Sequence, residues 1–424
     1  MSPERESCNS RHFTWLMKSC FPNPHDTTTT TTTKHSSQPQ PHPTSPAHAT
    51  TISSLPDDIV LDFLTRVPPS SLPSLSLVCL SLVCRRWSRI LHSSDFSDLR
   101  RHLKLIRHTA IALTATDFGF SAASLLDGAW NPSFFLPCYD AISLHNFHSL
   151  ISQARVASIG SRIFIVGSNA TVRYDTWAGT VVPRSNMIFP RKKFALAAVS
   201  GKIYIAGGCS RTSAVEEYDP ITNTWSVVSH APRRRYGCIG ASTDGVFYVI
   251  GGLRIGAAEQ NEISRAVLGT EARAAYASSM DLYDVEGRNW LRSRAVPGGG
   301  CVVAACASAG KVYVLTSHTV ELWFWSFEAQ RKCGGRGGAL GEWCRIKSPP
   351  LPVQVRVDTR MRFSCVGMGE KVVLIQVAGC VNAERRGGSK EGFVLVYDCV
   401  TGEWERGADL PEVYRRAAYV SVEC

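Results

Sequence analysis

One short phrase recurs three times along the chain: a tyrosine followed by an aspartate, with a tryptophan seven residues after the tyrosine. The three copies are Tyr218-Asp219 with Trp225, Tyr283-Asp284 with Trp290, and Tyr397-Asp398 with Trp404. A fixed internal spacing of this kind is typical of a structural unit that is repeated along a chain. The sequence therefore predicts a repeat architecture.

Each copy of the phrase is preceded by an apolar run with the composition of a β-strand. The runs are Lys202–Ala206, Val246–Ile250 and 371–377, and a glycine doublet directly follows each of the first two. Such a doublet lets the backbone turn tightly with positive φ. A strand, a turn, a second strand ending in Tyr-Asp, and a third strand opening on tryptophan make up most of a four-stranded blade.

These units resemble the kelch repeat, which implies a β-propeller. Counting one tryptophan for each blade predicts six blades, with weaker copies before and between the clear ones: Trp130, Trp177, Trp225, Trp290, Trp343 and Trp404. The segment His108–Thr116 reads as a first strand and 416–422 as a lone last strand. Because a propeller buries its end blades only by closing the ring, we expect these two strands to pair.

A change in composition near residue 51 separates the propeller from what precedes it. Residues 1–50 contain seven consecutive threonines and a Gln/Pro-rich stretch, which predicts a disordered tail. Residues 53–67 then read as an amphipathic helix with a capping serine, Asp57 and Asp58 in the first turn, and apolar pairs Ile59/Phe63 and Val60/Leu64. A second helical stretch runs from about Ser70 to Leu91.

These helices resemble an F-box, on the residues Leu55-Pro56-Asp57-Asp58, the helix end at Val67-Pro68, and Val83-Cys84-Arg85-Arg86-Trp87. The resemblance implies docking on a Skp-family adaptor and, through it, on a cullin-RING ubiquitin ligase. The residues that it assigns to the adaptor contact are Leu55, Pro56, Ile59, Leu64, Leu75, Val83 and Trp87. A small helical cap on the propeller is the alternative interpretation.

The segment Leu75–Cys79 is repeated at once as 80–84, where the F-box pattern carries one copy. Five extra helical residues rotate the face by about 140° beyond a full turn, so both copies cannot face the adaptor in one register. The expected organisation is a disordered tail over 1–50, an F-box over 51–95, a linker helix over 96–108, and a kelch-type propeller over 109–424. The fold class is an all-β six-bladed propeller preceded by a small all-α module.

Composition argues against several other classes of function. The sequence has no apolar run near 18 residues and no secretory signal, so we expect no membrane span and a cytoplasmic or nuclear location. None of the fifteen cysteines forms a Cys-x-x-Cys pair, which argues against a metal site. The net charge of +11 is spread over short clusters, so we do not expect nucleic-acid binding.

The order of F-box and propeller resembles the F-box/kelch-repeat proteins common in plants. That resemblance implies a non-catalytic substrate receptor of an SCF-type ubiquitin ligase, with no cofactor. A non-degradative kelch scaffold and a kelch-type metallo-oxidase are the alternatives. The oxidase needs converging histidines, and only His230 and His318 lie within the blades.

In similar kelch receptors, basic residues that enter the first strand of a blade often line the substrate face. On this sequence that pattern assigns target binding to Lys193, Arg235, Arg360, Arg362 and Arg415. Guanidinium groups grip carboxylates and phosphates through paired hydrogen bonds, so the expected target carries an acidic or phosphorylated segment. The alternative is that these cations form ordinary surface ion pairs.

Overall fold

The computed structural model describes residues 54–67, 85–91, 93–116, 118–137, 150, 154–176, 180–255, 276–318, 321–328, 341–351, 362–378, 392–415 and 417–423. The expected tail 1–50, together with Leu75, Val83, Trp177 and Arg360, lies outside these residues.

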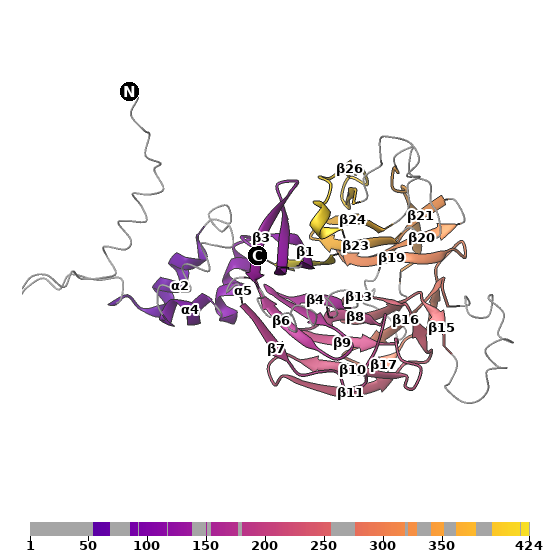
Figure 1. Cartoon of the computed structure of the whole chain (residues 1–424), viewed down its shortest axis with the longest axis horizontal. Helices are drawn as coiled ribbons and strands as arrows, with labels where there is room; N and C mark the ends of the chain where they lie inside the picture. Colours follow the sequence, from indigo (N-terminus) through magenta and orange to yellow (C-terminus); the bar gives the residue numbers. More distant parts are fainter. Residues whose placement is uncertain are drawn as a thin grey trace, which may run out of the picture.

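Six antiparallel sheets follow one another around a central axis and form a six-bladed β-propeller (Figure 1). Blades 1 to 3 contain β1 His108–Thr116, β2 Gly119–Leu126 and β3 Ala129–Pro137; β4 Arg155–Ile159, β5 Arg162–Val166, β6 Thr171–Asp175 and β7 Thr180–Arg184; and β8 Ala195–Val199, β9 Lys202–Ala206, β10 Ala214–Asp219 and β11 Thr224–His230.

Blades 4 to 6 follow the same order. Their strands are β13 Ile239–Thr243, β14 Val246–Ile250, β16 Ser279–Asp284, β17 Asn289–Trp290 and β18 Arg294–Ala295; β19 Cys301–Ser308, β20 Lys311–His318, β21 Glu321–Glu328 and β22 Trp343–Ile346; and β23 Arg362–Met368, β24 Lys371–Ala378, β25 Val394–Asp398 and β26 Trp404–Arg406. A two-stranded ribbon, β12 Arg235–Tyr236 with β15 Leu253–Arg254, lies outside blade 4.

The ring is closed by the last strand of the chain, β27 Ala418–Glu423. This strand pairs antiparallel with β1, from His108 opposite Glu423 to Leu113 opposite Ala418. It therefore supplies the innermost strand of blade 1, as the sequence predicted for the lone last strand. A short 3-10 helix, η3 Glu412–Tyr414, leads into it.

The core of the propeller lies between neighbouring blades, and the repeated tyrosine and tryptophan belong to it. Tyr218 and Trp225 face each other across β10 and β11 with ring centroids 4.9 Å apart. The indole Nε1 of Trp225 donates to the carbonyl of Ser185, which follows the last strand of the preceding blade, at 2.8 Å. Trp290 and Trp404 also pack against their tyrosines with tilted rings, and each donates a hydrogen bond to the preceding blade. In the three blades that carry it, the repeated phrase therefore packs the outer strands and joins the blade to its neighbour.

The glycine doublets turn with positive φ, as their sequence position predicted. All four glycines of the two doublets have φ between 66° and 86°. A Cβ on Gly208 would lie 2.6 Å from the carbonyl oxygen of Lys192, and one on Gly207 would lie 2.8 Å from that of Arg235. These turns therefore need glycine both for the backbone conformation and for the close approach of the next loop.

The helical module contains α2 Asp57–Thr65, α4 Arg85–Leu91 and α5 Ser94–His102, beside blade 1 (Figure 1). Asp57 and Asp58 occupy the first turn of α2, as predicted, but the capping serine is a correction. Pro56 is the N-cap residue and no side chain caps the helix, because the first turn begins only after the proline. The α5 helix overlaps the expected linker helix 96–108, and its Phe96 packs in the core of the module. Within the described residues, no helix combines the length and apolarity needed to cross a membrane.

Candidate functional site

The α2 helix carries two apolar stripes that point in different directions. Val60 and Leu64 are buried against α4 and α5, with 2% and 0% of their surface exposed. Ile59 and Phe63, one position earlier in each pair, are 50% and 57% exposed. The periodicity of the sequence indicated both pairs, and the packing of the other helices decides which pair forms the core.

Pro56, Ile59 and Phe63 form an exposed apolar surface, called here the outer stripe of α2. Two of these residues were among the predicted adaptor contacts, and Leu55 lies half-buried next to them, against the core of the module. Phe63 was not among the predicted contacts, although its i, i+4 spacing to Ile59 was the signal for it. Apolar side chains exposed together on one short helix are a surface suited to a protein partner.

Leu64 and Trp87 do not belong to that surface, and their expected role is corrected. Their exposed fractions are 0% and 4%, and they pack with Ile90, Leu91 and Phe96 in the core of the module. In this chain they support α2 from inside and offer no exposed area for an adaptor. Leu75 and Val83 lie outside the described residues.

Two arginines fix the position of α2. Arg86 on α4 forms an ion pair with Asp57 at the start of α2 and donates to the carbonyl of Leu55. Arg100 on α5 is fully buried and donates to the carbonyls of Thr65 and Val67 at the other end, at 3.1 and 3.2 Å. The outer stripe is therefore held at both ends by side chains of the other two helices.

A second candidate site lies on one face of the propeller. In four-stranded antiparallel blades, the loop entering the first strand and the loop joining the second and third strands emerge on the same side. We call this side the loop face. In blades 3 and 4 it carries the basic runs 191–193 and 233–235, followed by β8 and β13.

One arginine of each run is buried and bound within its own blade. Arg191 donates to Glu216 through Nε and Nη2, at 2.9 and 2.8 Å, and to the carbonyl of Gly207 at 2.8 Å. Arg235 repeats the arrangement with Asp281 at 2.8 Å and the carbonyl of Gly251 at 2.8 Å. Both guanidinium groups have 0% exposure. The two arginines therefore fix loops of the loop face to strands of their own blades.

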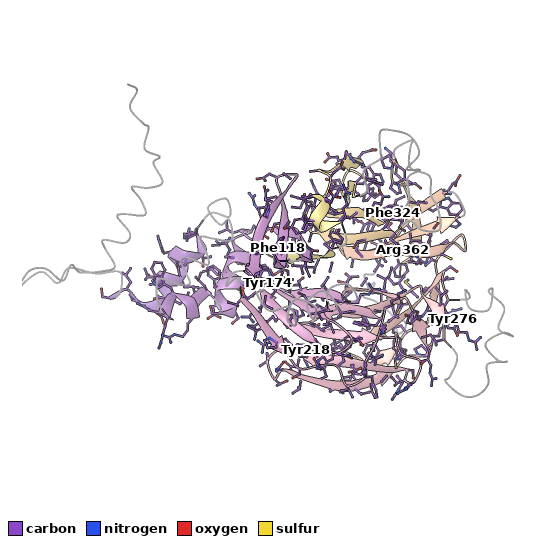
Figure 2. The ribbon with its side chains drawn as sticks, viewed as in Figure 1. Phe118, Tyr174, Tyr218, Tyr276, Phe324 and Arg362 are labelled. Atoms are coloured by element: carbon purple, nitrogen blue, oxygen red, sulfur yellow. The ribbon has the colours of Figure 1, made fainter. Side chains whose placement is uncertain are left out.

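The prediction that Arg235 contacts a target is therefore corrected. Its guanidinium group faces Asp281 inside blade 4 and lies beside Tyr276, which is at the edge of the propeller near β15 (Figure 2). Its charge and hydrogen bonds are used within the fold. Burial raises the pKa of the neighbouring Cys238 thiol, even though the positive charge of Arg235 opposes this effect.

Three other cations of these runs remain at the surface, as does Arg254 of β15, whereas Arg233 lies 3.5 Å from the carboxylate of Asp281. Lys192, Lys193 and Arg254 are exposed and Arg234 is half-exposed, and we call these four residues the basic patch. The ammonium group of Lys193 lies 5.6 Å from the ring centre of Tyr236, whose strand pairs with the strand of Arg254. Arg234 donates to the carbonyl of Ser210 at 3.3 Å. Across the described ranges, no carboxylate lies within ion-pair distance of any of the four.

The remaining predicted target contacts lie on other blades. Arg362 is the first residue of β23 and is exposed. Arg415 precedes β27, is 25% exposed, and lies 3.6 Å from the carboxylate of Glu412. Arg360 lies outside the described residues. The predicted set is therefore distributed around the ring, and of its members Lys193 alone belongs to the basic patch.

The described part of the chain holds no group of three histidine, cysteine or acidic side chains placed to bind a metal ion. His318 stacks on Trp323 with ring centroids 3.8 Å apart, and burial, reinforced by Arg345, lowers its pKa. His230 lies on the outer strand β11 of another blade. His230 and His318 therefore do not converge, and His108, the first residue of β1, is exposed on blade 1.

Comparison with known proteins agrees with both halves of this arrangement. The F-box domain profile matches residues 52–99 and the Kelch motif profile matches residues 190–231. F-box/kelch-repeat protein At5g26960 of Arabidopsis thaliana is 54% identical over 431 residues, covering 99% of both chains. F-box/kelch-repeat protein At1g67480 of the same plant is 28% identical over 47% of this chain and 54% of that protein. Among solved structures, that of YjhT aligns over 61% of this chain and 84% of its own at 17% identity, with a TM-score of 0.43.

Proposed function

Because the chain belongs to the F-box/kelch-repeat family, we propose that it is the substrate-recognition subunit of an SCF-type ubiquitin ligase. In this proposal α2 docks on a Skp-family adaptor and the propeller holds the protein to be ubiquitylated. The chain itself catalyses no covalent step. It acts in the cytoplasm or nucleus by bringing a target lysine close to the ubiquitin-charged carrier.

The observation that carries the proposal is the outer stripe of α2. Ile59 and Phe63 are large apolar side chains that the helical module leaves half uncovered, although it buries Val60 and Leu64 of the same helix completely. Burying an apolar side chain of this size contributes about 1.5–3 kcal/mol. The stripe is presented by a helix whose two ends are fixed by Arg86 and Arg100.

The basic patch is the part of the propeller best suited to hold the target. Its four cations lie together on the loop face, and Tyr236 adds an aromatic surface among them. Arginine and lysine that are not already paired can form charge-assisted hydrogen bonds with carboxylates or phosphates. We therefore place an acidic or phosphorylated target segment on Lys192, Lys193, Arg234 and Arg254.

The experiment is a binding assay between the purified full chain and a Skp-family adaptor. The double variant Ile59→Ala/Phe63→Ala should weaken binding at least tenfold, because a few buried apolar anchors usually dominate such an interface. Ile221→Ala is the matched control, since Ile221 is also an exposed isoleucine but lies on blade 3. Equal affinity of the double variant and the wild type would refute docking through the outer stripe.

The same preparations also separate the ligase role from a scaffold role. Lys193→Glu/Arg234→Glu should abolish capture of an acidic target while adaptor binding stays at the wild-type level. Absence of any adaptor binding by the folded wild-type chain, with target capture retained, would instead favour the non-degradative scaffold.

A further inference from the structure

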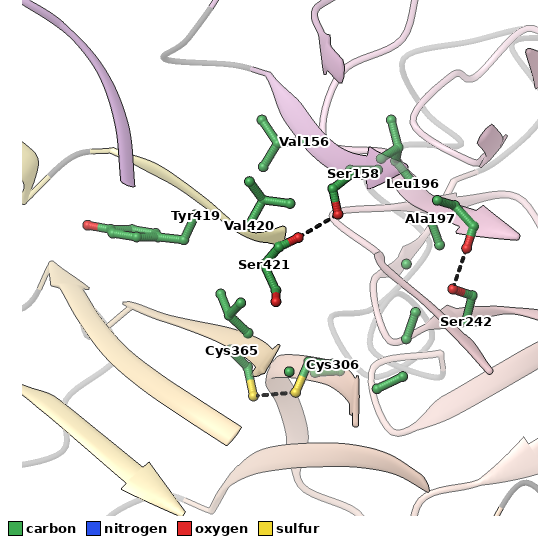
Figure 3. A pocket seen from close by; sticks show the side chains of 18 residues that line it. Val156, Ser158, Leu196, Ala197, Ser242, Cys306, Cys365, Tyr419, Val420 and Ser421 are labelled. Carbon is green, nitrogen blue, oxygen red and sulfur yellow. Dashed lines mark hydrogen bonds between the residues drawn. The ribbon is translucent and has the colours of Figure 1, made fainter. Parts of the chain in front are cut away.

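Two cysteines face each other at the centre of the propeller. A cavity of about 230 Å³ lies on the axis and is lined by the inner strands β4, β8, β13, β19, β23 and β27. Cys306 of β19 and Cys365 of β23 are among the lining residues, and their sulfur atoms are 3.0 Å apart (Figure 3). The two residues come from different blades, 59 positions apart in the sequence.

The two strands approach each other closely at this point for a reason that is visible in the sequence. A Cβ on Gly367 of β23 would lie 1.9 Å from the carbonyl oxygen of Ala307 on β19, so a glycine is required there. The hydroxyl of Ser308 donates to the carbonyl of Gly369 at 2.7 Å and fixes the strands just beyond. The cysteine pair is therefore held by the backbone on both strands.

Cys306 occupies a position that carries alanine in other blades. In the strand register, Cys306 pairs with Tyr313 in the same way as Ala197 pairs with Tyr204 and Ala241 with Tyr248. The fold therefore accepts a methyl group at this position and does not need a thiol for packing. In blade 5 this position carries a thiol, and the thiol of Cys365 in blade 6 lies next to it.

We propose that Cys306 and Cys365 are a dithiol site that a peroxide oxidises to a disulfide between blades 5 and 6. A disulfide has a sulfur–sulfur distance of about 2.05 Å, so the two atoms need to approach by only about 1 Å. A water molecule occupies about 30 Å³ in the liquid, so the cavity has room for hydrogen peroxide beside the thiols.

The half-buried Cys365 is the first sulfur to react. Its thiolate attacks one oxygen of hydrogen peroxide, the oxygen–oxygen bond breaks, and the released hydroxide takes up a proton to give water. The sulfur of Cys306 then attacks the resulting sulfenic acid and displaces hydroxide, which takes the proton of Cys306 and leaves as a second water. Two thiols lose two electrons in total and one peroxide gains them. Burial and the neighbouring Cys365 hold the pKa of Cys306 well above its usual range, so Cys306 suits the second step.

The test is a peptide map of the full chain after treatment with hydrogen peroxide and alkylation without a reductant. Trypsin releases Cys306 in the peptide 295–311 and Cys365 in the peptide 363–371. We expect these two peptides to be recovered as one disulfide-linked species that a thiol reductant separates. The oxidised protein should also melt about 5 °C above the reduced protein, since the bond closes a loop of about 60 residues.

Cys301 provides the matched control, because it lies in the same tryptic peptide but is exposed at the start of β19. Cys301→Ser should still form the linked species. Cys306→Ala and Cys365→Ala should each abolish it and remove the shift in melting temperature. The proposal is wrong if Cys306 and Cys365 are alkylated separately after a treatment that has fully oxidised Cys301, or if the linked species persists in Cys306→Ala.

Discussion

The buried charge pair of blade 4 allows a sharp test of how the loop face is built. Arg235 donates to Asp281, to the carbonyl of Gly251 and to the hydroxyl of Ser279, the last at 3.0 Å. Replacing it with methionine leaves the buried carboxylate of Asp281 with Ser293 at 2.6 Å and the more distant Arg233 at 3.5 Å. Removing one partner of a buried pair costs about 3–5 kcal/mol. Since Arg233 can compensate in part, we expect Arg235→Met to lower the free energy of unfolding by about 3 kcal/mol.

For a propeller of about 300 residues, that loss corresponds to a melting temperature lower by about 4–5 °C, measured by circular dichroism. Arg234→Met is the control, since the neighbouring side chain is partly exposed and surface changes stay within about 0.5 kcal/mol. The double variant Arg235→Met/Asp281→Leu should recover most of the stability, because it removes the isolated charge. A melting temperature of Arg235→Met equal to that of the wild type would refute the reasoning and return Arg235 to the candidate target contacts.

Two further predictions concern the blades. Trp225→Ala should lower the free energy of unfolding by about 2–4 kcal/mol, because it removes both the ring contact with Tyr218 and the hydrogen bond to Ser185 of the preceding blade. A denaturant unfolding curve equal to that of the wild type would contradict this role of the tryptophan. His318 has a lowered pKa in the folded chain, so the unfolded chain binds more protons below about pH 6.5 and stability falls as the pH drops through that region. His318→Gln should therefore lose less stability than the wild type between pH 7.5 and 5.5. Identical losses of melting temperature in the two proteins would contradict a lowered pKa of His318.

The strands and the closure of the ring were predictable because their signals are local. Apolar runs before glycine turns, and a tryptophan at constant spacing after Tyr-Asp, mark the strands of a blade wherever they occur. Pairing of β27 with β1 followed from the need of a propeller to bury its end blades, and the register from His108 to Leu113 bears this out.

The burial of Arg235 was not apparent from its own neighbourhood, where three consecutive arginines suggest a surface. The burial becomes predictable when the two repeats are compared. Glu216 and Asp281 both stand two residues before the tyrosine of a Tyr-Asp phrase, and both blades have an arginine before their first strand. In the helical module, the two apolar pairs of α2 are equivalent in the sequence. Only the packing of α4 and α5 decides which pair is buried.

The helical module that carries the outer stripe is joined to the propeller more by one buried arginine than by exposed ion pairs. The exposed pair between Arg101 of α5 and Glu423 of the closing strand is worth about 0–1 kcal/mol. Arg100, by contrast, is fully buried and joins the end of α2 to Leu105, just before β1, through bonds to the carbonyls of Thr65, Val67 and Leu105. In the proposed ligase, the direction in which the outer stripe points relative to the propeller therefore depends on Arg100. Its loss would disturb the geometry of ubiquitin transfer without touching the outer stripe or the basic patch.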